Sequence, residues 1–207
     1  MGNRAIVKPK DKNIGVYLHW NGGIDSVTAF LKYCELRRFR AFDDDYGIAR
    51  FCQVVGNFFG GSLSMGIETD IDESKVDDMW LDNGIWIVEG WDIVDHVGNY
   101  EPSEGYDLDD FLHYIDQQQP IKEQLGDFLD AVETPIADIK LGDIVFVEDI
   151  EGYYEKRRVI GFGGDEYVNG HYVLDVPYVD KWGSGPDNIN NYIFEKARVF
   201  KEEIEYE

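Results

Sequence analysis

The stretch from Gly15 to Leu36, GVYLHWNGGIDSVTAFLKYCEL, constrains the fold more than any other part of the chain. Its first six residues alternate in the manner of a short strand, and Asn21 to Gly23 then makes a tight turn. Asp25 or Ser26 can cap the helix that follows, because apolar residues recur there at the spacing of one helix face. The sequence therefore predicts a strand, a glycine turn and a helix in direct succession.

Residue patterns along the rest of the chain predict an α+β protein with three parts. Residues 1–98 alternate strand and helix patterns, and we expect there an antiparallel sheet that carries two helices. Residues 99–133 predict an acidic helical connector, and residues 134–207 predict a small β-barrel domain. The opening of the third part, Leu141 to Asp143, and the short strands after it resemble SH3-like barrels.

Two kinds of periodicity locate the expected elements. Apolar residues at helical spacing predict helices at Asp45–Phe58, at Asp107–Gln118 and after Pro120. Alternating or short apolar runs bounded by turn residues predict strands. The predicted strands are Arg4–Lys8, Ile14–Trp20, Ser62–Ile67, Ile85–Val88, Trp91–Val97, Ile144–Glu148, Val159–Phe162, His171–Val176 and Ala197–Lys201.

Acidic side chains are concentrated in the middle of the chain. The net charge is −23, and residues 41–151 carry 28 Asp and Glu against four Lys and Arg. Residues 1–40 carry three acidic against eight basic residues. Such a surface repels nucleic acids and anionic membranes, and it attracts basic proteins or cations. Because solubility needs a net charge of only about 2–8 in a small domain, the excess indicates a basic partner.

The helix expected after Pro120 gathers part of this charge on one side. Its acidic residues recur at steps of four, three and three, and they are Glu123, Asp127, Asp130 and Glu133. Each like-charge pair at this spacing costs about 0.2–0.5 kcal/mol, so the stripe is predicted to be an uncompensated array. We predict that a partner contacts this stripe together with the acids of the preceding helix, Asp107, Asp109, Asp110 and Asp116. Further contacts are expected at Asp43, Asp44, Asp45, Asp70, Asp72, Asp77 and Asp78, with Trp80 and Tyr100 as aromatic anchors.

No metal or cofactor site is expected. Cys34 and Cys52 lie in predicted helices without metal-ligand spacing, and we interpret both as reduced core residues. Asp70 to Ser74 begins like an EF-hand loop, but Lys75 stands where glycine is needed and Leu81 where the bidentate glutamate should be. No apolar run approaches the roughly 18 residues of a membrane span, and the first residues lack the apolar block of a signal peptide.

The glycine turn itself has one functional interpretation. Asn21 to Ser26, NGGIDS, resembles the Ser-Gly-Gly-x-Asp-Ser loop of the PP-loop ATP pyrophosphatases. The resemblance implies that Gly22, Gly23, Asp25 and Ser26 approach a pyrophosphate at the helix N-terminus. The first serine of that motif is an asparagine here, and that fold needs a parallel βαβ series. A PP-loop-like nucleotide-binding enzyme is therefore the alternative hypothesis.

A second resemblance overlaps the same turn. The residues from Tyr17 to Gly22, YLHWNG, resemble the Tyr-x-His-Trp-Asp-Gly stretch of uncharacterised bacteriophage and prophage proteins. By charge and size the chain is also similar to the DNA-mimic anti-restriction and anti-CRISPR inhibitors. The resemblances imply a phage protein in the cytoplasm of a bacterial host. It would inhibit, without catalysis, a basic nucleic-acid-binding defence protein such as a CRISPR effector or a restriction enzyme. An acidic phage structural or interaction module is a further alternative.

Overall fold

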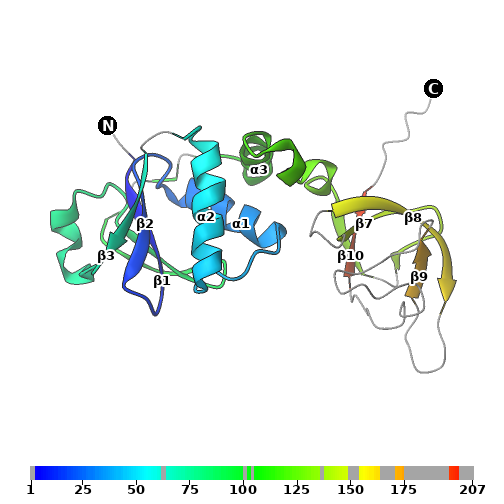
Figure 1. Ribbon diagram of the computed structural model, residues 1–207, viewed down its shortest axis with the longest axis horizontal. Helices are drawn as coiled ribbons and strands as arrows, with labels where there is room; N and C mark the ends of the chain where they lie inside the picture. The colour runs from blue at the N-terminus through cyan, green and yellow to red at the C-terminus, as the bar shows by residue number, and fades with distance from the viewer. Residues whose placement is uncertain are drawn as a thin grey trace. The chain divides into compact units, whose positions relative to one another are not determined.

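The computed structural model describes residues 3–61, 64–99, 102–103, 105–135, 138–148, 154–163, 171–174 and 196–200. The chain divides into two compact units, unit 1 of residues 1–124 and unit 2 of residues 125–207 (Figure 1). The boundary lies between Gln124 and Leu125. Residues 99–124 therefore belong to unit 1, and the predicted separate connector is divided between the two units.

Unit 1 is built on a mixed sheet of five strands in the order β3-β2-β1-β4-β5. The strands are β1 Ala5–Pro9, β2 Ile14–Leu18, β3 Met65–Thr69, β4 Ile85–Glu89 and β5 Asp92–Val97. Their neighbours are antiparallel except for β1 and β4, which are parallel. The predicted all-antiparallel sheet is wrong at this pair. The long segment between the two strands supplies the crossover that parallel pairing requires.

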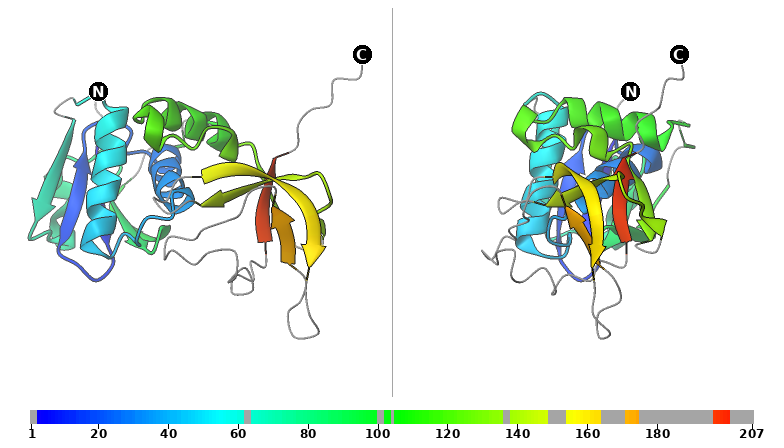
Figure 2. Two further views of the ribbon diagram at one scale, coloured as in Figure 1. Left: turned by 45° about the vertical axis from the view of Figure 1, so that its right-hand side comes forward. Right: turned by 90° about the vertical axis from the view of Figure 1, so that its right-hand side faces the viewer.

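Three helices accompany this sheet: α1 Ile24–Leu36, α2 Asp45–Phe58 and α3 Leu108–Gln117. Figure 2 shows α1 and α2 along the same side of the sheet, and α3 packs against α1. Each helix buries most of the apolar stripe that its spacing predicted, although Leu108 at the start of α3 is exposed. Phe30 of α1 lies at the centre, with its ring within 6.4 Å of the rings of Phe51, Phe58, Phe59 and Phe111. The helices are thus held together by one aromatic cluster.

The opposite face of the sheet is covered by the segment between β3 and β4. It contains a 3-10 helix, η1 Glu73–Met79. Ile71 is buried there against Ile6, Ile85 and Ile87 of the sheet, and Val76 packs on this group from η1. The central strands are therefore covered on both faces, which explains why all five residues of β1 are buried.

Unit 2 contains a second five-stranded sheet in the order β6-β10-β7-β8-β9, and all of its described pairs are antiparallel. The strands are β6 Val132–Pro135, β7 Ile144–Glu148, β8 Tyr154–Gly163, β9 His171–Leu174 and β10 Lys196–Phe200. The Phe128 ring packs against two aromatic rings of this sheet, with centroid distances of 4.0 Å to Tyr154 and 5.4 Å to Phe146. The described strands confirm the predicted β-rich part, but a closed SH3-like barrel is not supported.

The helix predicted after Pro120 does not form. Two short 3-10 turns stand in its place, η2 Ile121–Glu123 and η3 Gly126–Phe128, separated by an extended Gln124. Gly126 has φ of +53°, a conformation that ends any continuous right-handed helix. The following residues then pair with β10 as strand β6. The helical spacing of the acids was therefore overridden by strand pairing with a segment more than 60 positions later.

Candidate functional site

The glycine turn that precedes α1 is packed against the N-terminal segment. Asn21 has φ of +55°, and the Gly22 N–H donates to the Asn3 carbonyl oxygen at 2.8 Å. The Trp86 indole donates to the Gly22 carbonyl oxygen, also at 2.8 Å. A Cβ atom at Gly22 would lie 2.6 Å from the Asn3 oxygen and 2.7 Å from Ala5. Glycine is required here by close backbone approach, which accounts for the motif without a ligand.

The polar residues of this turn have structural partners. The Asp25 carboxylate accepts from the Ser103 hydroxyl at 2.7 Å and from the Gly105 N–H at 2.9 Å. Ser26 is buried, and its oxygen accepts from the Asn21 amide at 3.3 Å. Gly23 caps α1 without a side-chain hydrogen bond. Strand β2, which leads into the turn, is antiparallel to both of its neighbours. The arrangement does not favour the PP-loop alternative.

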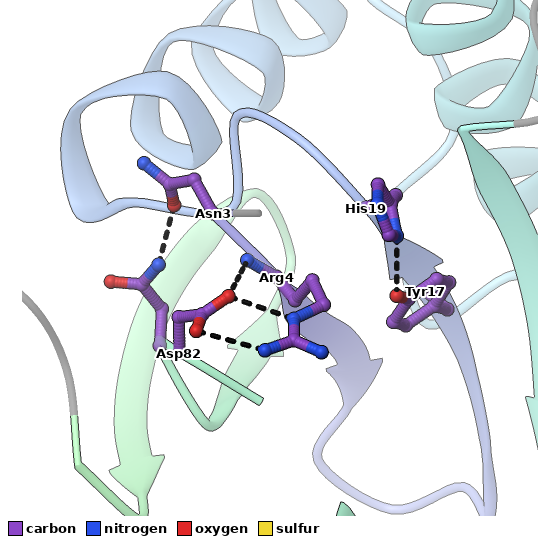
Figure 3. A network of polar contacts seen from close by, with 6 residues as sticks. Asn3, Arg4, Tyr17, His19 and Asp82 are labelled. Carbon is purple, nitrogen blue, oxygen red and sulfur yellow. Dashed lines mark hydrogen bonds and ion pairs between the residues drawn. The ribbon is translucent and has the colours of Figure 1, made fainter. Parts of the chain in front are cut away.

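A polar network close to the turn ties β1 to the segment before β4 (Figure 3). The Arg4 guanidinium contacts both Asp82 carboxylate oxygens, at 2.8 and 3.0 Å, and the Arg4 N–H also donates to Asp82. These donors hold the pKa of Asp82 below its usual range. The Tyr17 hydroxyl and His19 Nδ1 are 2.9 Å apart. The network pairs its charges internally, and we interpret it as structural.

Two residues of the acidic triplet at the start of α2 are paired with basic side chains. Asp45 lies 2.5 Å from the Lys12 ammonium, and Asp44 lies 3.7 Å from the Arg40 guanidinium. Asp44 also caps α2 by accepting a backbone N–H at 2.8 Å. Asp43 is exposed and accepts a weak backbone hydrogen bond from the β4–β5 turn at 3.3 Å. All three carboxylates accept contacts from nearby residues of the fold, so they do not form the uncompensated acidic array that was predicted.

The acids around η1 are partly compensated as well. Asp72 caps η1 and pairs with Lys75 at 2.8 Å, and these donors lower its pKa to about 2. Asp70 and Asp77 are exposed. The side chain of Asp78 lies outside the described residues, as does Tyr100. Trp80, which ends η1 at φ of +55°, is largely exposed, as an aromatic anchor requires.

Asp116 was predicted to contact a partner, and this prediction is wrong. Its side chain is only 5% exposed, and it accepts a hydrogen bond of 2.6 Å from the Tyr33 hydroxyl of α1. Burial and this bond raise the pKa of Tyr33 far above its ordinary value. Tyr33 is itself buried. Asp116 therefore anchors α3 to α1 and is not available to a partner.

The predicted stripe from Glu123 to Glu133 is not an array. Glu123 lies in unit 1 and accepts from the Gln53 amide at 2.9 Å. Asp127 belongs to unit 2 and forms an ion pair with Lys156. Asp130 and Glu133 are exposed, but no helix joins them to the others.

The first turn of α3 still has the exposed carboxylates that the predicted partner-binding surface requires. Asp107 caps the helix by accepting from the N–H groups of Asp109 and Asp110, at 3.0 and 3.1 Å. The latter two carboxylates are exposed and have no ion pair among the described residues. Large apolar side chains of the same short segment are exposed as well. We call this set the α3 face, and its members are Tyr106, Asp107, Leu108, Asp109, Asp110 and Tyr114.

The aromatic members of the α3 face are held in place but remain accessible. Tyr106 stacks on Phe111 with 5.2 Å between ring centroids, and it is 47% exposed. Tyr114 contacts the Phe58 ring edge-on at 5.2 Å and is 51% exposed. Neither residue was predicted to contact a partner. Tyr114 lies off the buried stripe of amphipathic helix α3, and that position was the available signal, whereas Tyr106 precedes the helix.

The part of the chain that the structure describes contains no metal site, no membrane-spanning helix and no reactive thiolate. No group of three or more His, Cys, Asp or Glu side chains is arranged there to hold a metal ion. Within the same residues no helix combines the length and the apolar character of a membrane span. Cys34 and Cys52 are free thiols, and burial raises the pKa of both, that of Cys52 to about 11. Neither is therefore a reactive thiolate.

Comparison of the chain with protein-family models, with curated proteins and with solved structures finds no match.

Proposed function

We propose that the protein is a non-catalytic inhibitor that binds a basic, nucleic-acid-handling host defence protein, such as a CRISPR effector or a restriction enzyme. The single observation that carries the proposal is the α3 face, where exposed carboxylates that have no ion pair among the described residues occur in the same segment as half-exposed tyrosine rings. Tyrosine is enriched among residues that dominate binding energy, and exposed acids steer a basic partner toward the surface.

The charge of the whole chain supports a basic partner. Unit 1 carries 23 Asp and Glu against 11 Lys and Arg, and unit 2 carries 19 against eight. Both units are therefore strongly acidic, even though several individual carboxylates are paired. A field of this sign favours encounter with proteins that present lysine and arginine, and it falls with added salt.

The geometry of α3 limits how far this surface can imitate DNA. A duplex carries one phosphate charge per roughly 1.7 Å of its axis, over many base pairs. Asp109 and Asp110 supply two exposed charges on one helical turn. They replace only a short run of phosphates, so Tyr106 and Tyr114 would have to contribute much of the affinity. The rigid anchor between Tyr33 and Asp116 would keep this face from moving on binding.

A pair of charge reversals tests the proposal. Asp109→Lys with Asp110→Lys alters the α3 face, whereas Asp92→Lys with Asp95→Lys makes the same change of charge on exposed β5. DNA cleavage by guide-loaded CRISPR effectors and by restriction enzymes is measured with each protein at stoichiometric amounts. We expect the wild-type protein to inhibit at least one of these enzymes. The α3 variant should weaken inhibition by about 30-fold or more, as for loss of a central interface residue.

The control variant should change inhibition much less, because it leaves the α3 face intact. Circular dichroism of both variants checks that the helices persist. Equal losses in the two variants would show that net charge alone is responsible and would overturn the α3 assignment. If no defence nuclease is inhibited, while a virion protein binds the wild type and not the α3 variant, the protein is a phage structural module.

A further inference from the structure

Strand β3 forms one edge of the unit 1 sheet, and no other described strand pairs with its outer side. Hydrogen bonds at both ends of the strand identify the direction of its backbone groups. The His19 N–H donates to the Ser64 oxygen at 2.8 Å, and the Asp70 N–H donates to the Asn13 oxygen at 3.0 Å. Because bonded and non-bonded pairs alternate in antiparallel strands, the even-numbered residues of this edge are bonded to β2.

The odd-numbered residues therefore direct their backbone groups outward. Met65, Ile67 and Thr69 each present an N–H and a C=O group at the open edge. Ile67, at the centre of the strand, has a side chain that is 51% exposed. The register with β2 continues over all five residue pairs without a bulge. This edge is a regular template with an accessible apolar side chain in its middle.

The opposite edge of the same sheet is protected. Its pairing with β4 is interrupted by a register shift between Ile87 and Val88. Strand β5 also exposes the charged side chains of Asp92 and Asp95. Bulges and charges are the usual devices that prevent an edge from accepting another strand. Strand β3 has no bulge, and its one charged residue is Glu68.

We propose that β3 accepts an extended, basic segment of a partner protein as a sixth, antiparallel strand. Charge complementarity favours a basic occupant, because the exposed Glu68 carboxylate borders the edge and the net charge of the chain is −23. A second copy of the chain would bring the same charge and would leave Glu68 without a cation. This surface is separate from the α3 face and does not depend on it.

The register specifies the residues of the incoming strand. The residue opposite Ile67 would be apolar and β-branched, with its side chain beside that of Ile67. The residue before it would lie opposite Glu68 in a close non-bonded pair, where lysine or arginine neutralises the carboxylate. The residue after it would lie opposite Gly66, which leaves space beside the Tyr17 ring for an aromatic side chain. The expected order is basic, β-branched, aromatic.

A synthetic peptide tests this edge. The probe is acetyl-Thr-Lys-Val-Tyr-Val-Lys-amide, and the control replaces both lysines with glutamate. Amide hydrogen exchange of the full-length protein is measured with each peptide. We expect the probe to slow exchange at Ile67 and Thr69 by about tenfold or more, because their N–H groups become hydrogen-bonded. The amides of Gly66 and Glu68, already bonded to β2, should not change. Absence of selective slowing at the odd-numbered amides would overturn the proposal.

Two variants separate strand addition from general charge attraction. Ile67→Pro removes an outward N–H without removing a bond to β2, and Ile67→Lys places a cation at the edge. Val94→Lys on β5 is the matched control, because Val94 is 46% exposed and the change of charge is the same. Each Ile67 variant should lower peptide affinity about tenfold relative to the control. Equal binding by all three variants overturns the proposal. So does concentration-dependent dimerisation in sedimentation that the peptide does not reverse.

Discussion

The two ends of helix α3 carry the same kind of residue in different surroundings. At the C-terminal end, Asp116 is buried and accepts the Tyr33 hydroxyl at 2.6 Å. At the N-terminal end, Asp109 and Asp110 are exposed and have no ion pair among the described residues. One aspartate therefore stabilises the fold, whereas the others are available for binding. The difference shows that acidic residue counts do not by themselves identify a contact surface.

Among substitutions at the two ends of α3, Asp116→Ala is expected to have the largest effect on stability. The substitution leaves the Tyr33 hydroxyl buried without its acceptor, and it removes a charge-assisted hydrogen bond. We expect the free energy of unfolding to fall by about 2–3 kcal/mol, measured by urea denaturation. Tyr33→Phe and the double variant complete a mutant cycle. A loss below about 0.5 kcal/mol would mean that the bond does not anchor α3.

The pH dependence of stability tests the same anchor. Since the pKa of Tyr33 is raised in the folded state, its contribution is fully present below the ordinary tyrosine value of about 10. Above that pH the unfolded chain releases the proton and the folded chain retains it. Stability should therefore fall by about 1.4 kcal/mol per pH unit from this group. Comparison of wild type with Tyr33→Phe between pH 9 and 11 isolates the contribution, which should vanish in the variant.

A smaller loss is expected from Asp107→Ala at the other end of α3. Asp107 accepts two backbone N–H groups of the first turn. Removal of such a cap costs about 1 kcal/mol, which thermal or urea unfolding would detect. Asp107→Ser, which preserves an acceptor, serves as the control and should lose much less. If both variants are equally destabilised, the charge at the helix N-terminus matters more than the cap.

The smallest effect on stability is expected from Asp109→Asn with Asp110→Asn. These side chains are exposed and make no described ion pair, so unfolding should change by less than about 0.5 kcal/mol. Their effect should appear in partner binding instead, where both charges are lost. A variant that is clearly destabilised would show that these carboxylates, like Asp116, belong to the fold.

Local signals predicted most of the first unit. Helix α2 has the predicted bounds Asp45–Phe58, because Asp44 caps it and its apolar spacing is regular. The predicted strands that became β1, β2, β4 and β5 are also confirmed, and β1–β2 and β4–β5 pair in the expected antiparallel sense. The parallel pairing of β1 with β4 was not predictable, since its partners are almost 80 positions apart. The helical acidic stripe was wrongly predicted for a similar reason, because β6 pairs with the distant strand β10.

The sequence by itself determined the strand, glycine turn and helix around Asn21 to Ser26, together with the net charge of −23. Both depend on neighbouring residues or on composition. Tertiary structure alone decided which carboxylates remain on the surface. Asp116 and Asp109 cannot be distinguished by residue type, because burial depends on Tyr33, which is 83 positions away from Asp116. Ion pairs such as that between Asp45 and Lys12 likewise require the folded chain to bring opposite charges together.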